Sequence, residues 1–109
     1  FDRTQLIRVV TNLVKNGIQA IPYDQPDAQI IVSVITDNNL VRIDVEDNGI
    51  GISEDNKAKI FEPKFTTKSS GMGLGLAMVK NIVETYDGNI TFTSVLGKGT
   101  IFTVTFPKK

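Results

Sequence analysis

The chain has no cysteine and no histidine among its 109 residues. Their absence excludes disulfides, thiolate or imidazole metal sites, and catalysis by a Ser-His or Cys-His pair within this chain. A metal ion would therefore have to be bound by oxygen atoms, which suits magnesium. The sequence also lacks an apolar run close to the roughly 20 residues that span a bilayer. Its first residues do not resemble a signal peptide.

Neither sign of charge is in excess. Twelve basic and 12 acidic residues give a formal net charge of zero. This balance provides no general attraction to nucleic acid or to an anionic membrane, so any anion must be bound locally. The length and the 40% share of hydrophobic residues are typical of one globular domain. We expect residues 1–109 to be a single domain cut from a longer protein, because a helical pattern begins close to Phe1.

Apolar residues recur every three or four positions over residues 2–21, which predicts an amphipathic helix. Asp2 or Thr4 is expected to cap its start, and Pro22 limits its end. The pattern is formed by Leu6, Val9, Val10, Leu13, Val14, Ile18 and Ile21.

Two hairpins are predicted. Residues 29–36 are rich in β-branched side chains and residues 40–47 alternate apolar with polar, so these two strands should pair with one face buried. Residues 89–94 and 100–106 should pair around the glycine-containing turn at 96–99.

Two further helices are predicted between the hairpins. Ser53 is expected to cap a short helix that runs to about Phe61, and residues 74–86 form a second one that ends with Gly88 in the left-handed conformation. Residues 62–73 lack periodicity and are typical of a mobile loop. This order predicts helices on one face of a mixed sheet with four clear strands. A further edge strand is expected upstream of the first residue.

Asn12 and Asn16 lie four residues apart, so they share one helix face, which Gln19 continues. Amides in mid-helix lower the helix propensity slightly, so two aligned amides need an explanation. One explanation is that Asn16 binds Mg²⁺ through its side-chain oxygen. The alternative, a solvated polar face beside the apolar stripe, is the commoner meaning of an isolated pair.

Residues 47–52 (Asp-Asn-Gly-Ile-Gly-Ile) follow directly on a predicted strand. Asp47 can accept a hydrogen bond from an exocyclic amine such as that of adenine, and Gly49 and Gly51 permit positive φ and the close approach of a flat ring. A guanine carbonyl would face the carboxylate with no proton between them, so discrimination would be sharp. The alternative is a simple Asp-Asn-Gly turn, which the motif alone favours.

Residues 71–76 (Gly-Met-Gly-Leu-Gly-Leu) precede a helix, and glycine-rich loops that run into helix N-termini are typical phosphate sites. The pattern is not the dinucleotide-binding G-x-G-x-x-G, and a lone G-x-G-x-G is weak evidence. Lys68 can reach a phosphate as a point charge, whereas Lys64 is more readily an ordinary solvated lysine. Phe61 and Phe65 are interpreted as core anchors rather than as docking residues.

Together these motifs describe a nucleotide pocket, and their order resembles the ATP-binding catalytic domain of sensor histidine kinases. Five motifs in the order in which this family has them argue against coincidence, and the resemblance covers essentially the whole chain. The wider superfamily includes the ATPase domains of gyrase, Hsp90 and MutL. The matching positions are Asn16, Asp47, Gly49, Gly51, residues 61–68, Gly71, Gly73, Gly75, Gly99 and Thr100.

The resemblance implies a Bergerat fold, an α/β two-layer sandwich whose mixed, mostly antiparallel sheet is covered on one face by about three helices. It implies ATP and Mg²⁺ as ligands, with Asn16 on the metal and Asp47 on the adenine amine, helped by a water near Gly51 and Thr100. Backbone groups would hold the phosphates, and residues 64–72 would form a lid. The residues implied for nucleotide binding are Asn12, Asn16, Asp47, Gly49, Gly51, Lys68, Gly71, Gly73, Leu74, Gly75 and Thr100.

The resemblance also implies partners. The phosphoryl acceptor would be a histidine on a separate dimerisation domain, and the phosphoryl group would pass to the receiver domain of a response regulator. The full-length protein is expected to be a homodimer, with this domain in the cytoplasm and an anchor in the inner membrane left open. No nucleic acid partner and no direct membrane contact by this domain are expected.

Two alternatives remain open. Members of the superfamily that hydrolyse ATP or phosphorylate serine have a pattern with a glutamate four residues before the metal-binding asparagine. That position is Asn12 here. An amide is no general base at neutral pH, so strong ATP hydrolysis is not expected and a serine kinase is disfavoured. The second alternative is a degenerate docking module, against which the intact Asn16 and Asp47 count.

Overall fold

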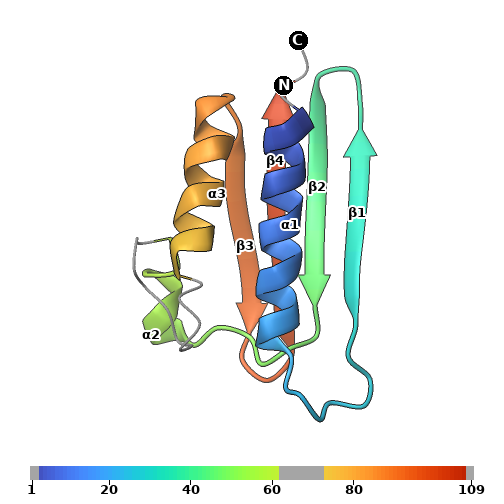
Figure 1. The fold of residues 1–109 in the computed structure, drawn as a ribbon, viewed down its shortest axis with the longest axis vertical. Helices are drawn as coiled ribbons and strands as arrows, with labels where there is room; N and C mark the ends of the chain where they lie inside the picture. Colours follow the sequence, from blue (N-terminus) through green and yellow to red (C-terminus); the bar gives the residue numbers. More distant parts are fainter. Residues whose placement is uncertain (1–2, 62–72, 108–109) are drawn as a thin grey trace.

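The computed structural model describes residues 3–61 and 73–107. Seven helices and strands follow one another in these two stretches (Figure 1). In chain order they are α1 (Arg3–Ala20), β1 (Ile30–Thr36), β2 (Leu40–Asp47), α2 (Glu54–Lys57), α3 (Gly73–Thr85), β3 (Asn89–Val95) and β4 (Gly99–Pro107).

The four strands form one sheet in the order β1-β2-β4-β3, and each pair of described neighbours is antiparallel. Figure 1 shows α1 and α3 side by side on one face of this sheet, with α1 in front of β4 and next to β2, and α3 beside β3. The predicted two-layer α/β sandwich is therefore confirmed. The further edge strand expected before the first residue lies outside the described residues.

The core lies between the two helices and the inner face of the sheet. Inward positions alternate along β2 and β4, and α1 and α3 contribute positions three or four residues apart, as the periodicities require. Burying each such side chain contributes roughly 1.5–3 kcal/mol, so this face holds the helices on the sheet. The buried hydrophobic residues are Val9, Leu13, Ile43, Val45, Ile60, Leu76, Val79, Val83, Ile90, Phe102, Val104 and Phe106.

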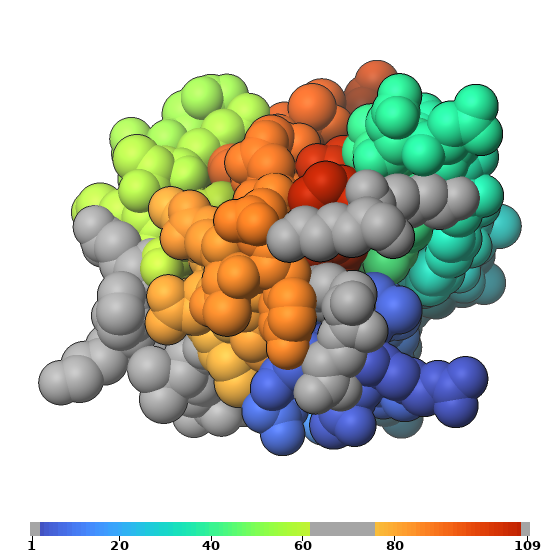
Figure 2. Space-filling view, turned by 90° about the horizontal axis from the view of Figure 1, so that it is seen from above, coloured from blue at the N-terminus to red at the C-terminus, as the bar shows by residue number. Residues whose placement is uncertain are grey.

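Two ends of the sandwich can be distinguished. Figure 2 shows the upper end, where the start of α1 (blue) lies beside α3 (orange) and the turn between β1 and β2 (teal) lies further along the sheet. At the opposite, lower end of Figure 1, α1 and β2 both finish, α3 begins, and a turn joins β3 to β4. The predicted site residues of the described stretches lie in the elements that meet at this lower end or lead to it.

The start of the first predicted helix differs slightly from the structure. Helix α1 begins at Arg3, so Thr4 lies inside its first turn and is not the residue before it, and Asp2 lies outside the described residues.

The predicted helix from Ser53 to about Phe61 is wrong in its length, because α2 ends at Lys57. A hydrogen bond from Lys59 N to Asn56 O, one residue tighter than an α-helical bond, replaces the expected pattern.

Ser53 occupies the N-cap position, but its hydroxyl makes no capping hydrogen bond. Its backbone carbonyl instead accepts the Asn56 and Lys57 N–H groups at 3.0 and 3.1 Å. The chain then turns so that Ile60 is buried and Phe61 packs edge-on against Phe92 and Phe102. Core packing therefore overrides the local helix signal.

The end of α3 also corrects one prediction. Asp87, and not Gly88, adopts the left-handed conformation, with φ of 62°. Gly88 N donates to Val83 O at 2.8 Å and Asp87 N donates to Glu84 O at 3.1 Å, the two bonds of a Schellman motif. Glycine is required at the next position for a different reason: a Cβ on Gly88 would approach Thr105 O and the Phe106 ring within 3.0 Å.

Candidate nucleotide-binding site

Asp47 is a buried polar residue of the predicted site. It is the last residue of β2, it lies on the inner face of the sheet, and only 5% of its surface is exposed. Its Oδ1 accepts the Gly49 N–H at 2.9 Å, which is the turn-forming bond of an Asp-Asn-Gly sequence. The simple turn considered as an alternative is therefore present, but it leaves a buried carboxylate at the end of the sheet.

Thr100 lies directly opposite Asp47 in the pairing of β2 with β4. Both side chains belong to the inner face, and Thr100 is also only 5% exposed. Side chains of directly opposed residues have Cβ atoms about 5 Å apart. The structure thus brings together two predicted base-binding residues that are 53 positions apart in the chain, which follows from their paired positions 47 and 100.

The last turns of α1 cover Asp47. A Cβ on Gly17 would lie 3.3 Å from the Asp47 Cβ and 3.5 Å from its Oδ2, so the bare glycine backbone allows the helix to approach the strand closely. Asn16, the neighbour of Gly17, is half-buried at this end of the helix. The predicted metal ligand and the predicted base acceptor therefore lie on adjoining elements.

The prediction for Gly49 and Gly51 is partly corrected. Gly51 has positive φ, 76°, as expected, but Gly49 does not belong to the positive-φ residues. A Cβ on Gly49 would overlap the Ala20 carbonyl, and one on Gly51 would overlap the Val95 carbonyl. Both glycines are therefore required by close contacts within the protein itself, in addition to any contact with a flat ring.

Asn48, which the sequence analysis did not single out, ties the segment after α1 to the end of β2. Its Oδ1 accepts the Gln29 N–H at 2.8 Å, and its Nδ2 donates to Asp27 O at 2.7 Å. Gln25 Nε2 donates to the Asn48 carbonyl at 2.9 Å. Ile50 N also donates to Ala20 O at 2.9 Å. These bonds hold Asp47 against α1, and an Asn after the Asp is the kind of residue that makes them.

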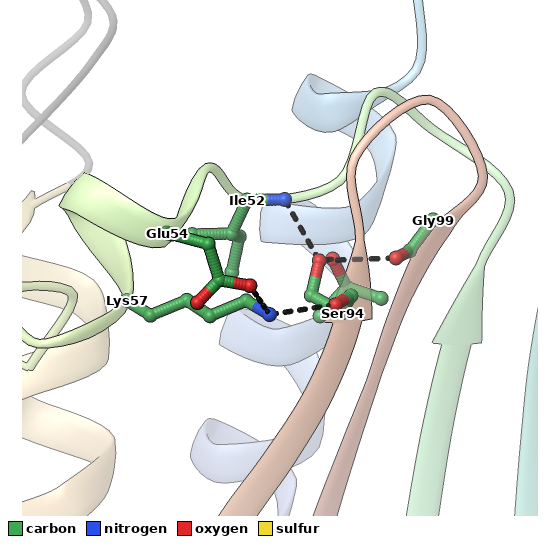
Figure 3. A network of polar contacts seen from close by, with 6 residues as sticks. Ile52, Glu54, Lys57, Ser94 and Gly99 are labelled. Carbon is green, nitrogen blue, oxygen red and sulfur yellow. Dashed lines mark hydrogen bonds and ion pairs between the residues drawn. The ribbon is translucent and has the colours of Figure 1, made fainter.

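A second network, centred on Ser94, links Thr100 to the segment after Gly51. Figure 3 shows Ser94 with Ile52, Gly99, Lys57 and Glu54. The Ser94 hydroxyl lies 2.8 Å from Thr100 Oγ1, accepts the Ile52 N–H at 2.7 Å and lies 3.0 Å from Gly99 O. Lys57 Nζ donates to the Ser94 carbonyl at 2.9 Å and to Glu54 Oε1 at 2.9 Å. Sequence reasoning missed Ser94, because its partners lie on other segments of the chain.

The turn between β3 and β4 fits closely against β2. Gly99 has φ of 137°, and a Cβ on it would overlap the Asp47 carbonyl. Lys98 N donates to Val95 O at 2.9 Å, which closes the turn, as predicted for residues 96–99. A hollow of about 180 Å³ lies at this edge, lined by Glu46, Asp47, Thr93, Ser94, Val95, Lys98, Gly99, Thr100 and Ile101.

That hollow is not by itself the nucleotide pocket. Its volume is below the roughly 300–1,000 Å³ of typical ligand pockets. Strand alternation also puts Glu46, Thr93 and Ile101 on the outward face of the sheet, whereas Asp47 and Thr100 face inward.

The remaining predicted residues divide into three groups. Asn12 is half-buried, and its Nδ2 donates to Arg8 O of its own helix at 2.8 Å. Gly73, Leu74 and Gly75 form the first turn of α3, so their backbone N–H groups lie at the helix N-terminus, a position that can favour phosphate. Lys68, Gly71, Lys64 and Phe65 lie outside the described residues.

Phe61 is confirmed as a core anchor. Its ring packs edge-on against Phe92 and Phe102 at centroid distances of 5.9 and 6.4 Å, and Lys80 Nζ lies 5.5 Å from its centre. Within residues 3–61 and 73–107 no three carboxylates gather as a metal site. None of the helices in these stretches is long and apolar enough to cross a membrane.

Comparisons with known proteins agree with this geometry. The sensor histidine kinase ZraS of Escherichia coli (strain K12) is 44% identical over 106 residues, which cover 97% of this chain and 22% of that protein. Sporulation kinase A of Bacillus subtilis (strain 168) is 42% identical over 108 residues, covering 99% and 17%. The chain thus spans about a fifth of the length of these curated relatives.

Solved structures agree as well. The catalytic domain of histidine kinase ThkA superposes with a TM-score of 0.83 at 36% identity, covering 98% of this chain and 68% of that one. A model of the family described as "Histidine kinase-, DNA gyrase B-, and HSP90-like ATPase" matches residues 1–109. The chain therefore belongs to this ATPase family, and within it to the ATP-binding catalytic domains of the sensor histidine kinase type.

Proposed function

We propose that this chain binds Mg-ATP at the lower end of the sandwich and presents the γ-phosphoryl group to a histidine on a separate domain. The observation that best supports the proposal is the pair formed by Asp47 and Thr100. Both side chains are only 5% exposed, and they lie opposite each other in the pairing of β2 with β4. The last turns of α1 approach Asp47 closely at Gly17. Burying a carboxylate is costly, and a base amine that donates a hydrogen bond to it would offset that cost.

The proposed roles follow from the elements that carry the residues. Asp47 accepts a hydrogen bond from the adenine amine, with Thr100 and a water near Gly51 beside it. Backbone N–H groups of Gly73, Leu74 and Gly75 meet the phosphates at the start of α3, where the helix dipole favours negative charge. The prediction that Gly71 and Lys68 join them stays a prediction.

Magnesium fits the donor set of the described residues. Mg²⁺ keeps several waters and takes few protein ligands, so it needs an oxygen donor beside the phosphates and no carboxylate cage. Asn16 offers such an oxygen, because its half-buried amide lies on the helix that covers Asp47. When bound, the ion would neutralise phosphate charge, and Asn12 would lie one helical turn away.

Histidine kinase activity is proposed for the longer protein of which this chain would be the catalytic domain. The names of ZraS and of the ThkA domain support this. Because the chain has no histidine, the acceptor would have to lie on another domain. The proposed partners are a histidine-bearing dimerisation domain, a response regulator receiver domain and a second copy of the full-length protein. A cytoplasmic position of this domain is part of the same proposal.

Isothermal titration of the chain tests the proposal. We expect ADP and a non-hydrolysable ATP analogue to bind, to bind more tightly with Mg²⁺, and to be preferred over GTP. Adding a histidine-bearing dimerisation domain from a relative should then allow phosphoryl transfer from ATP. A chain that binds no adenine nucleotide, with or without Mg²⁺, would support the docking-module alternative instead.

A further inference from the structure

Ser94 is buried at the centre of a network that no nucleotide-binding motif includes (Figure 3). Its hydroxyl oxygen has three neighbours within hydrogen-bond distance: Ile52 N at 2.7 Å, Thr100 Oγ1 at 2.8 Å and Gly99 O at 3.0 Å. A hydroxyl offers one proton and two lone pairs, so three partners use its full capacity.

The partners determine where each proton lies. The Ile52 N–H can only donate, so it occupies one lone pair of Ser94 Oγ, and the Gly99 carbonyl can only accept, so it takes the Ser94 proton. Ser94 Oγ then has a single lone pair left for Thr100. The Thr100 hydroxyl must therefore donate its own proton to Ser94 for all of these buried groups to be satisfied.

This arrangement fixes what Thr100 can offer to a ligand. With its proton committed to Ser94, Thr100 Oγ1 has only lone pairs left, and Asp47 in its ionised form is also an acceptor without a proton. The two opposed side chains therefore form a pair of acceptors. Such a pair matches the N–H groups of an amine on a purine, and it repels the carbonyl that guanine carries at the same position.

We propose that Ser94 is a positioning residue for base selection: it holds the Thr100 hydroxyl so that the site presents acceptors only, and thereby helps to exclude guanine. This inference rests on the proposed function, since it concerns the same nucleotide site. The Ser94 hydroxyl is bonded to Thr100, Ile52 and Gly99, so no contact between Ser94 and the base is proposed. Its effect is transmitted through the direction of one hydroxyl.

The test compares ADP and GDP binding to the chain by isothermal titration. In Ser94→Ala the Thr100 hydroxyl is released and can rotate to donate to a guanine carbonyl. We expect the ratio of ADP to GDP affinity to fall by about three- to tenfold, the worth of roughly one hydrogen bond, mainly because GDP binds better. Ser94→Thr keeps the hydroxyl and should retain the ratio. Thr91→Ala, an exposed position on the same strand, is the matched control.

A double variant separates positioning from general loosening of the site. Once Thr100→Val has removed the hydroxyl, adding Ser94→Ala should leave the ratio unchanged, because nothing remains to be oriented. Equal weakening of ADP and GDP in Ser94→Ala, or an unchanged ratio with a folded chain by circular dichroism, would overturn the inference. Wild-type chain that binds neither nucleotide would overturn the proposed function itself, a result that differs from both.

Discussion

Replacing Asp47 with asparagine tests the proposed recognition of the base separately from folding. Asparagine has nearly the same shape, and its Oδ1 can still accept the Gly49 N–H that Asp47 accepts at 2.9 Å. The other carboxylate oxygen becomes an NH₂ group, which presents a donor where the adenine amine needs an acceptor. A hydrogen bond to a charged group is worth about 1.5–3 kcal/mol, so we expect ADP affinity to fall roughly 10- to 150-fold.

The assay is titration with ADP and GDP at pH 7, in parallel with Asp44→Asn. Asp44 lies on the same strand, but on the outward face, where Arg42 and Thr103 contact it at 3.1 and 2.8 Å. The same chemical change there should leave both affinities unaltered. If Asp47→Asn kept the wild-type preference for ADP, or if Asp44→Asn lost it equally, Asp47 would have no role in recognising adenine.

Three further outcomes are expected. Asn16→Ala should weaken Mg-ADP by roughly tenfold, about 1.4 kcal/mol, and metal-free ADP much less, which titration with and without Mg²⁺ measures. Gly49→Ala should lower the free energy of unfolding, measured in urea, by about 1–3 kcal/mol, because the new Cβ would overlap the Ala20 carbonyl. A Cβ on Gly97 meets no atom within 4 Å, so the control Gly97→Ala should lower this free energy by only about 1 kcal/mol, through its φ of 84°. Burial tends to raise the pKa of Asp44, but the hydrogen bonds from Arg42 and Thr103 and the charge of Arg42 lower that pKa below its ordinary 3.8. The ionised carboxylate therefore stabilises the folded chain above pH about 4, and this stabilisation is lost as pH falls through the lowered pKa. The difference in the free energy of unfolding between wild type and Asp44→Asn should therefore shrink in acid.

The long elements were predictable because each is governed by a local period. The three- and four-residue spacing over residues 2–21 predicted α1, which covers Arg3–Ala20. The alternation of residues 40–47 predicted β2 with its observed bounds, Leu40–Asp47, and its buried face. In both, a pattern repeated over several turns or pairs outweighs the uncertainty at any one residue.

Features that depend on contacts between distant segments were not predictable. The order β1-β2-β4-β3 and the pairing of Asp47 with Thr100 are set by packing, which no local period reports. The early end of α2 follows from the burial of Ile60. The close contact of Gly49 with Ala20 gives that glycine a role inside the protein that its motif does not indicate.

The candidate site shows the same division. The residues that are proposed to contact the nucleotide could be predicted from the sequence because the motifs that carry them are short and contiguous. Ser94 could not, because its hydroxyl joins Ile52, Gly99 and Thr100, which come from two other places in the chain. A single serine in a strand gives no signal of its own until the register of β3 with β4 is known.

Asn12 bears on where the phosphoryl group would go. Its Nδ2 donates to Arg8 O at 2.8 Å, so one of the two amide N–H groups is bound to its own helix, and the side-chain oxygen is a neutral amide oxygen. A neutral amide oxygen cannot remove a proton from water near pH 7, and no imidazole exists in the chain to do so instead. Under the proposed function, bound ATP would thus be protected from rapid hydrolysis, and transfer would wait for a histidine supplied by another domain.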